Sequence, residues 1–229
     1  MKIAFFDLDH TLLPIDSGDR WTRELVSHAG DDRQALEAEA ERFHQGYLAG
    51  DFDIDECVAF QLGLLARYPR EKLDAWRDAF VRDVVAPIVP ARSVALVRAS
   101  EAMGFHPVLA TGTHAYIAEA VAPLFGIEDV IAARPEVDAS GAFTGGIVGS
   151  HSYQEGKLRL AQAYVDAKEA SGVKVEALQA YSDSINDVSL LRYAASRGEA
   201  FAVNPDKALE RVALEEHWPV IELFAKDSN

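Results

Sequence analysis

Short apolar runs that each end abruptly in acids or hydroxyl residues constrain the fold of this chain most. Helical segments separate these runs along the sequence. Strands that alternate with helices predict a mostly parallel sheet covered on both faces, which is an α/β fold. The three clearest runs and their polar ends are residues 3–6 with Asp7 and Asp9, residues 107–110 with Thr111 and Thr113, and residues 178–181 with Ser182 and Asp183.

The segment between the first two runs has a different pattern. Residues 16–86 carry apolar residues at helical spacing, interrupted by Gly- and Pro-containing breaks, and no convincing strand. We interpret this segment as a helical insertion. The remaining residues, 1–15 and 87–229, are then expected to form one core, with a hairpin or irregular excursion at 136–149 and short later strands at 130–132, 200–203 and 220–221.

Composition and charge narrow the class of partner. The 229 residues are 49% hydrophobic and carry a formal net charge of −15, which argues against nucleic acid or an anionic membrane as a partner. No window reaches the ~18 apolar residues of a membrane span, so a cytoplasmic protein is expected. The single cysteine, Cys57, lies in a probable helix and is interpreted as a small buried hydrophobe. An anionic substrate would need local positive charge, which a divalent cation could supply.

The polar ends of the strands are expected to meet, because ligands of open parallel sheets bind beyond the carboxyl ends of the strands. Acids, a hydroxyl and an amine together would suit Mg²⁺ and phosphate. Each residue also has a purely structural interpretation: Asp9 could cap a turn, Asp183 and Asp187 could cap a helix, and Lys157 could be an ordinary lysine at a helix start.

Four segments in order resemble the motifs of the haloacid dehalogenase superfamily, whose members are mostly phosphatases. The insertion directly after the first motif is similar to that of the branch that contains phosphoserine phosphatase. The resemblance implies a Rossmann-like three-layer core with a helical cap. The matching segments are Asp7-Leu8-Asp9-His10-Thr11, Thr111 after an apolar strand, Lys157, and Asp183 with Asp187.

The resemblance implies a role for each residue of the reaction centre. Asp7 would attack phosphorus and become an aspartyl phosphate, and Asp9 would protonate the leaving alcohol and then take a proton from water. Thr111 and the Gly112 N–H would hold the phosphoryl oxygens. Lys157 would order Asp7 and the phosphate. A carboxylate nucleophile divides hydrolysis into two easier steps.

The resemblance also implies Mg²⁺ as the cofactor. Asp7, the Asp9 backbone carbonyl and Asp183 would bind the ion directly, while Asp187 and Asn186 would act on it directly or through water. We interpret Thr113 and His114, which follow Thr111, as structural residues, and His10 as a neighbour of the site without a catalytic role.

The cap is expected to select the substrate. Asp16 stands where phosphoserine phosphatases have an acid that binds the substrate amine. The arginine that holds the substrate carboxylate in those enzymes would fall near Gln61, and the nearest arginine is Arg67. We therefore expect a small amine-bearing phosphate ester without a carboxylate, such as histidinol phosphate. The alternatives are a phosphoserine phosphatase, a phosphotransferase or phosphomutase on the same core, and a non-catalytic phosphate-binding module. A monomer or homodimer is expected.

Overall fold

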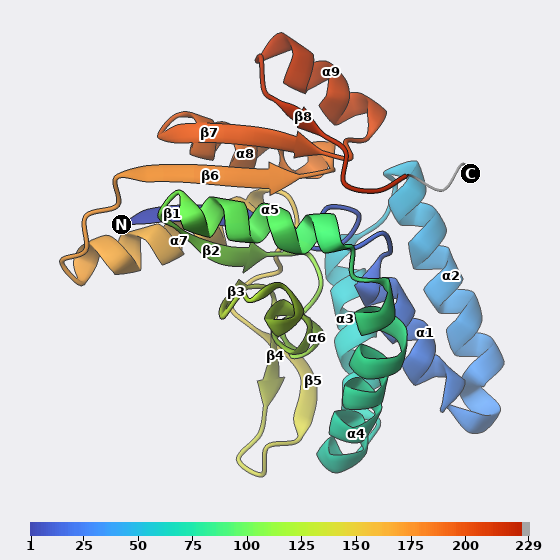
Figure 1. The fold of residues 1–229 in the computed structure, drawn as a ribbon. Helices are drawn as coiled ribbons and strands as arrows, with labels where there is room; N and C mark the ends of the chain where they lie inside the picture. The colour runs from blue at the N-terminus through green and yellow to red at the C-terminus, as the bar shows by residue number, and fades with distance from the viewer. Residues whose placement is uncertain (226–229) are drawn as a thin grey trace.

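A computed structural model describes residues 1–225 and contains a six-stranded sheet in the order β3-β2-β1-β6-β7-β8. All neighbouring strands in this sheet run parallel. The prediction of an α/β fold with a mostly parallel sheet is therefore confirmed (Figure 1). The strands are β1 (Lys2–Phe6), β2 (Phe105–Ala110), β3 (Asp129–Ile131), β6 (Ala177–Ser182), β7 (Gly198–Val203) and β8 (Val220–Ile221).

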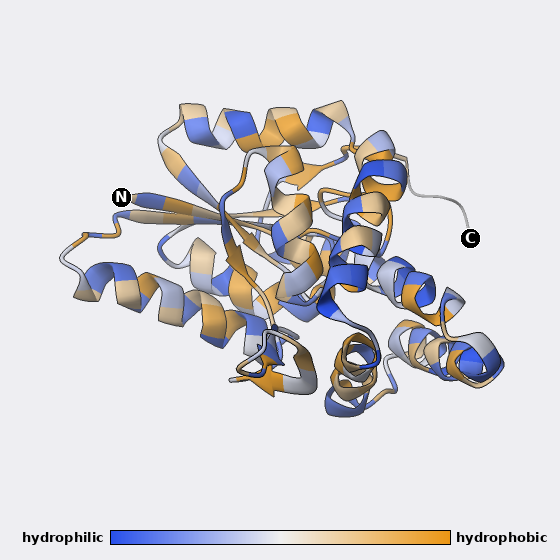
Figure 2. Ribbon diagram, turned by 90° about the horizontal axis from the view of Figure 1, so that it is seen from below, coloured by the Kyte–Doolittle hydropathy of each residue, from blue (hydrophilic) through white to orange (hydrophobic). Residues whose placement is uncertain are grey.

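Helices cover both faces of the sheet, because side chains of a strand alternate between its two faces. On β1, Ile3 and Phe5 belong to one buried cluster, which includes residues of α7, α8 and α9, whereas Ala4 and Phe6 belong to another, which includes residues of α5 and α6. Figure 2 shows the hydrophobic residues concentrated on the strands and on the helix sides turned toward them. These helices are α5 (Ala91–Ala102), α6 (Ala115–Val121), α7 (Glu155–Ala170), α8 (Val188–Ala195) and α9 (Lys207–Glu215).

The segment between β1 and α5 is helical, and Figure 1 shows its four main helices gathered at one end of the sheet. Asp16 and Asp53 cap the first and third of these helices with their side chains. The division into a core and a cap at residues 16–86 stays a prediction. The elements are α1 (Ser17–Ser27), η1 (Gly30–Asp32), α2 (Arg33–Ala49), α3 (Ile54–Ala66), α4 (Arg70–Phe80), the π-helix η2 (Val81–Val85) and η3 (Ala86–Ile88).

The glycine-rich excursion is a two-stranded antiparallel hairpin, β4 (Arg134–Val137) and β5 (Phe143–Val148). It packs against the cap helices: the Arg70 guanidinium lies 4.6 Å from the centre of the Phe143 ring. Gly145 of β5 has a φ of +86°, so a residue with a side chain would be strained there. A Cβ at this position would lie 3.6 Å from the Cα of Gly63 in α3. Two further short 3₁₀ turns are η4 (Ala122–Phe125) and η5 (Ile185–Asp187).

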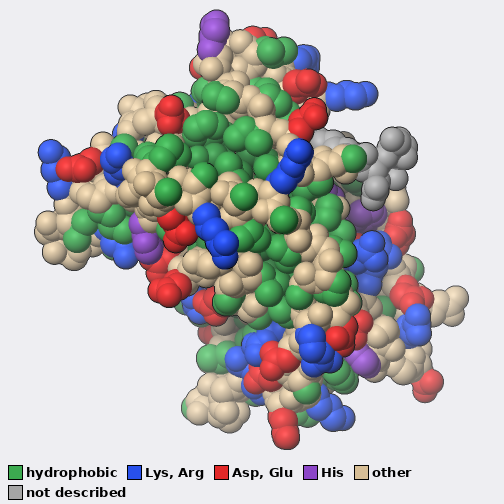
Figure 3. Space-filling model, viewed as in Figure 1, with side chains coloured by type: hydrophobic (Ala, Val, Ile, Leu, Met, Phe, Trp, Pro, Cys, Tyr) green, Lys and Arg blue, Asp and Glu red, His purple; other side chains and the backbone are tan. Residues whose placement is uncertain are grey.

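The surface carries both signs of charge despite the negative total. On the face seen in Figure 3, acidic and basic side chains are interspersed over the cap helices. Among the residues that the structure describes, none of the helices is long and apolar enough to cross a bilayer.

Candidate active site

The central feature of the site is a buried lysine between two carboxylates. Lys157, in the first turn of α7, places its Nζ 2.9 Å from Asp7 Oδ1 and 2.6 Å from Asp187 Oδ2. Asp7 directly follows β1, and its N–H donates to the Tyr181 carbonyl at 2.9 Å, which extends the pairing of β1 with β6 by one residue. The Ser182 hydroxyl donates to Asp187 Oδ2 at 2.6 Å. The sheet and α7 thus fix both acids.

Burial and charge work against each other in this cluster. Burial alone would lower the pKa of Lys157, but the attraction of Asp187 and Asp7 raises it above its ordinary value, so the ammonium stays charged. Burial raises the pKa of Asp7; Lys157 opposes this shift and Asp187 adds to it. One lysine does not neutralise two carboxylates, so the cluster keeps excess negative charge.

A third carboxylate adds to this excess. Asp183 follows β6, and the Thr11 hydroxyl lies 3.0 Å from its Oδ1 and 3.2 Å from Asp7 Oδ2. A hydroxyl has one hydrogen to donate, so it satisfies only one of the two carboxylates at a time. Burial raises the pKa of Asp183 well above its ordinary value, and the negative charge of Asp7 raises it further.

The residues present fit a magnesium ion. Asp7 and Asp183 supply hard carboxylate oxygens next to each other, since the Thr11 hydroxyl lies within 3.2 Å of one and 3.0 Å of the other. In residues 1–225, no group of three or more His, Cys, Asp or Glu side chains is arranged as a complete metal site. Mg²⁺ needs only one or two carboxylates, because it keeps water ligands and binds phosphate oxygens. Asp187 contacts Lys157 and Ser182, and its expected role at the metal stays a prediction.

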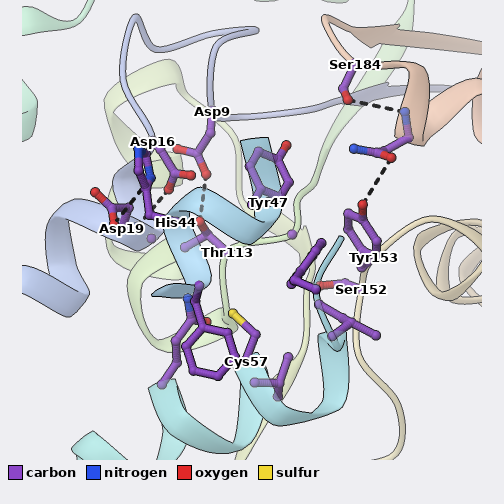
Figure 4. Close-up of a pocket in the computed structure, with 18 of the residues that line it drawn as sticks. Asp9, Asp16, Asp19, His44, Tyr47, Cys57, Thr113, Ser152, Tyr153 and Ser184 are labelled. Atoms are coloured by element: carbon purple, nitrogen blue, oxygen red, sulfur yellow. Dashed lines mark hydrogen bonds and ion pairs between the residues drawn. The ribbon is translucent and has the colours of Figure 1, made fainter. Parts of the chain in front are cut away.

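Asp9 is held by the start of α1 and by the segment after β2. Its Oδ1 accepts the Ser17 N–H at 2.7 Å and its Oδ2 accepts the Thr113 hydroxyl at 2.6 Å (Figure 4). Burial and the nearby charge of Asp16 raise the pKa of Asp9 to about 7, against the hydrogen bonds from Ser17 and Thr113, which lower it. Such a carboxyl group can give and take a proton near neutral pH.

Thr113 therefore contacts Asp9 and lines the cavity, and its interpretation as a structural residue stays a prediction. Thr111 lies deeper: its side chain is fully buried and its Oγ1 accepts the Thr113 N–H at 3.1 Å. Gly112 and Thr113 line the cavity above it. His114 is buried, and its Nδ1 has no hydrogen-bond partner among the described residues; its structural role stays a prediction.

A cavity of about 160 Å³ joins these residues to the cap helices. In Figure 4, Asp9, Asp16 and Thr113 lie on one side of it, and Ser152 and Tyr153 on the other. Asn186 lines it as well, and its Oδ1 accepts the Tyr153 hydroxyl at 3.1 Å. The cap contributes acidic and aromatic residues to the lining, namely Asp16, Asp19, Phe43, Tyr47, Phe52 and Phe60.

The position expected for a carboxylate-binding arginine holds Gln61, which lines the cavity. Among the described residues of the lining, none is an arginine. Arg67 is bound to Asp32 on the exposed side of the cap. The cavity therefore offers acids and aromatic rings, and no guanidinium, to the part of a ligand that reaches the cap.

Two further positioning residues escaped the sequence analysis. Thr11 is part of the first motif, and its hydroxyl lies between two carboxylates that are far apart in the sequence. Asn204 follows β7, and its Nδ2 donates to the carbonyls of His10 and Thr11 at 3.1 Å and 3.3 Å. The polar end of the strand at 200–203, Asn204-Pro205, was the available signal, because it matches the pattern of the other strand ends.

The sequence is similar to a known family of hydrolases and to bacterial phosphatases. The family model described as haloacid dehalogenase-like hydrolase matches residues 4–192. A histidinol-phosphatase of Neisseria meningitidis is 33% identical over 220 residues, which cover 96% of this chain and 98% of that protein. A probable phosphatase of Mycobacterium tuberculosis is 29% identical over 95% of this chain and 74% of its own length.

Solved structures resemble the fold over nearly the whole chain. A protein with unknown function from Bordetella pertussis has a TM-score of 0.88 at 33% identity, covering 97% of this chain and 99% of its own. A substrate-bound phosphoserine phosphatase has a TM-score of 0.65 at 17% identity, covering 99% of this chain and 94% of its own. At that identity the second likeness concerns the fold alone.

Proposed function

This chain belongs to the haloacid dehalogenase-like hydrolase family and is a phosphomonoesterase, and we propose that it hydrolyses a small amine-bearing phosphate ester through an aspartyl phosphate. The observation that carries the proposal is the placement of Asp7. Its carboxylate is held by Lys157 at 2.9 Å and lines a cavity shared with Asp9. Phosphoryl transfer requires such positioning and charge neutralisation more than elaborate covalent chemistry.

In the first step, an oxygen of Asp7 attacks phosphorus while the bond from phosphorus to the alcohol oxygen breaks. Asp9 gives its proton to that departing oxygen. Lys157 orients Asp7 and offsets the charge of the phosphoryl oxygens, which the Gly112 N–H and the Thr111 hydroxyl would bind. The pKa of Asp9, about 7, leaves a large protonated fraction at neutral pH for this step.

In the second step, water attacks the aspartyl phosphate and Asp9, now a carboxylate, accepts a proton of that water. Phosphate leaves and Asp7 is regenerated. Asp7, Asp183 and the Asp9 carbonyl would hold Mg²⁺, which supplies positive charge to the phosphoryl oxygens when it is bound. Asp187 accepts a hydrogen bond from the Lys157 ammonium and so helps to hold this lysine in place. Asn186 accepts the Tyr153 hydroxyl at the wall of the cavity.

The cap supports an amine on the substrate. Asp16 lines the cavity, and burial raises its pKa, so a bound ammonium would stabilise the charged carboxylate. The lining offers no arginine to a substrate carboxylate, and a bidentate partner is what such a group requires. Histidinol phosphate has an amine and no carboxylate. The name of the 33% identical relative supports the same choice.

The proposal is tested with a panel of phosphate esters and Mg²⁺, with free phosphate as the measured product. We expect histidinol phosphate or another amino-alcohol phosphate to be hydrolysed with the highest kcat/KM, and phosphoserine more slowly. A much faster reaction with phosphoserine would contradict the substrate class. Transfer of phosphate to an added alcohol in place of its release would favour the phosphotransferase alternative.

The nucleophile is tested by Asp7→Asn, which we expect to abolish turnover while the protein stays folded. Asp166→Asn, on the exposed side of α7, is the matched control and should keep full activity. Retention of Mg²⁺-dependent hydrolysis by the Asp7 variant would exclude the covalent mechanism.

A further inference from the structure

Asp9 is held at both of its carboxylate oxygens by groups from different parts of the chain. The Ser17 N–H, at the start of α1, donates to Oδ1 at 2.7 Å. The Thr113 hydroxyl, beyond the end of β2, donates to Oδ2 at 2.6 Å. Such short bonds to a carboxylate are charge-assisted and are about twice as strong as neutral hydrogen bonds. Each oxygen keeps a second lone pair, which leaves room for a proton and a substrate oxygen.

The Thr113 hydroxyl is itself fixed from two sides. The Thr113 N–H donates to Thr111 Oγ1 at 3.1 Å, which anchors its backbone to the end of β2. On the other side, a Cβ at Gly18 would lie 2.8 Å from Thr113 Oγ1, closer than real Cβ contacts come. Gly18 thus leaves the space that the hydroxyl occupies. Residues from β2 and from the start of α1 converge on one oxygen of Asp9.

We propose that Thr113 is a positioning residue, which, with the space left by Gly18, aims the Asp9 carboxyl group at the leaving-group oxygen. This inference rests on the proposed function, in which Asp9 is the proton donor of the first step. Misplacement of a catalytic group by about 1 Å can cost about 10²-fold in rate. Removal of the hydroxyl leaves Asp9 held at Oδ1 alone, so its carboxyl group can rotate away.

The chemistry gives a readout that separates positioning from folding. A proton from Asp9 is needed when the leaving group is an alkoxide, because the bond from phosphorus to oxygen must break as the oxygen is protonated. An aryl ester such as 4-nitrophenyl phosphate releases a stable phenolate and needs no such proton. kcat/KM reports the first step, whereas kcat also includes hydrolysis of the aspartyl phosphate, which uses Asp9 as a base for every substrate.

The experiment compares Thr113→Val with the wild type on 4-nitrophenyl phosphate and on the alkyl phosphate that the wild type hydrolyses fastest. We expect kcat/KM for the alkyl ester to fall about 10- to 100-fold and that for the aryl ester to change less than about 3-fold. With the aryl ester, kcat should fall more than kcat/KM. Thr113→Ser keeps the hydroxyl and should restore the ratio of the two kcat/KM values.

Two further variants complete the test. The added Cβ of Gly18→Ala would displace the Thr113 hydroxyl. Like Thr113→Val, this variant should lower the ratio of kcat/KM for the alkyl ester to kcat/KM for the aryl ester. Ser100→Ala removes a buried hydroxyl that donates to Gln179 Oε1 at 3.2 Å, away from the residues that line the cavity, and it should leave the ratio unchanged. Equal losses on both esters, or no loss on either, in Thr113→Val would overturn the inference. A wild type that hydrolyses neither ester would overturn the proposed function instead.

Discussion

The two walls of the cavity differ in how their charges are held. On the core wall, the side chains of Lys157 and Asp187 are 6% and 4% exposed, and they contact each other at 2.6 Å. On the cap wall, Asp19 is paired at 2.8 Å with Arg23, whose side chain is 43% exposed. Charge pairs in a dry environment interact strongly, whereas exposed pairs are screened by water. The Lys157–Asp187 pair is therefore expected to interact more strongly than the Asp19–Arg23 pair.

The largest effect is expected on the core wall, from Lys157→Met. This variant leaves Asp7 and Asp187 buried without a cation, so the free energy of unfolding of the metal-free protein should fall by about 3–5 kcal/mol. kcat should fall about 10²- to 10³-fold, as for the loss of one donor to a transition state. Urea unfolding and steady-state kinetics measure the two effects. Lys168→Met, on the same helix with an exposed partner 3.6 Å away, should change neither by much.

The next effect is expected from a buried histidine of the core, His114, and concerns the dependence of stability on pH. Burial lowers the pKa of His114 from 6.5 to about 4. Below pH 6.5 the unfolded chain binds a proton that the folded chain rejects, so stability is complete above pH 6.5 and declines as the pH falls toward 4. At pH 5 the loss amounts to about 2 kcal/mol.

His114→Leu should remove this part of the pH dependence. The measurement is the difference between the free energies of unfolding at pH 7.5 and pH 5, in wild type and variant. An equal difference in both proteins would contradict the assignment. His217→Asn is the control, because His217 is exposed and Asn tolerates its positive φ of 59°.

Some residues of the core side of the cavity could be predicted from the sequence pattern, whereas others could not. The strand ends that carry Asp7 and Asp183 follow apolar runs, and parallel pairing brings such ends together regardless of details. The fold class followed from this pattern. Lys157 could be proposed only through the resemblance to a family, because a lysine at a helix start has no distinctive local pattern.

The contacts that were missed are between side chains distant in the sequence. Thr113 and Asp9 are 104 residues apart, and Asn204 is 194 residues from His10. Periodicity describes which face of an element a residue occupies, but it does not say which side chain of another element meets it. For the same reason the lining of the cap, where helices α2 and α3 approach the core, could not be assigned from spacing alone.

A smaller effect is expected on the cap wall from Asp16→Asn. The amide can still accept the Asp19 N–H that caps α1, so the helix should be kept while the charge is lost. KM for an amine-bearing phosphate ester should rise about 10-fold, as for loss of a hydrogen bond to a charged group. KM for 4-nitrophenyl phosphate should change less than about 2-fold. Asp55→Asn, in the exposed first turn of α3, is the control, and equal changes for both esters would contradict a role in amine binding.

The smallest effect has the opposite sign and comes from Arg23→Met. Arg23 neutralises Asp19, which lines the cavity, and it also contacts Glu41 at 2.9 Å. Its removal leaves more negative charge facing the substrate, so KM for an amine-bearing ester should fall about 2-fold at low salt and return to the wild-type value at high salt. The free energy of unfolding should fall by less than about 1 kcal/mol, as for exposed pairs. Arg33→Met breaks a similar pair with Glu37 and should show the same small loss of stability with no change in KM. An unchanged KM with Arg23→Met at low salt would mean that Asp19 does not contribute to the potential in the cavity, and that Asp16 alone distinguishes the cap wall from the core wall.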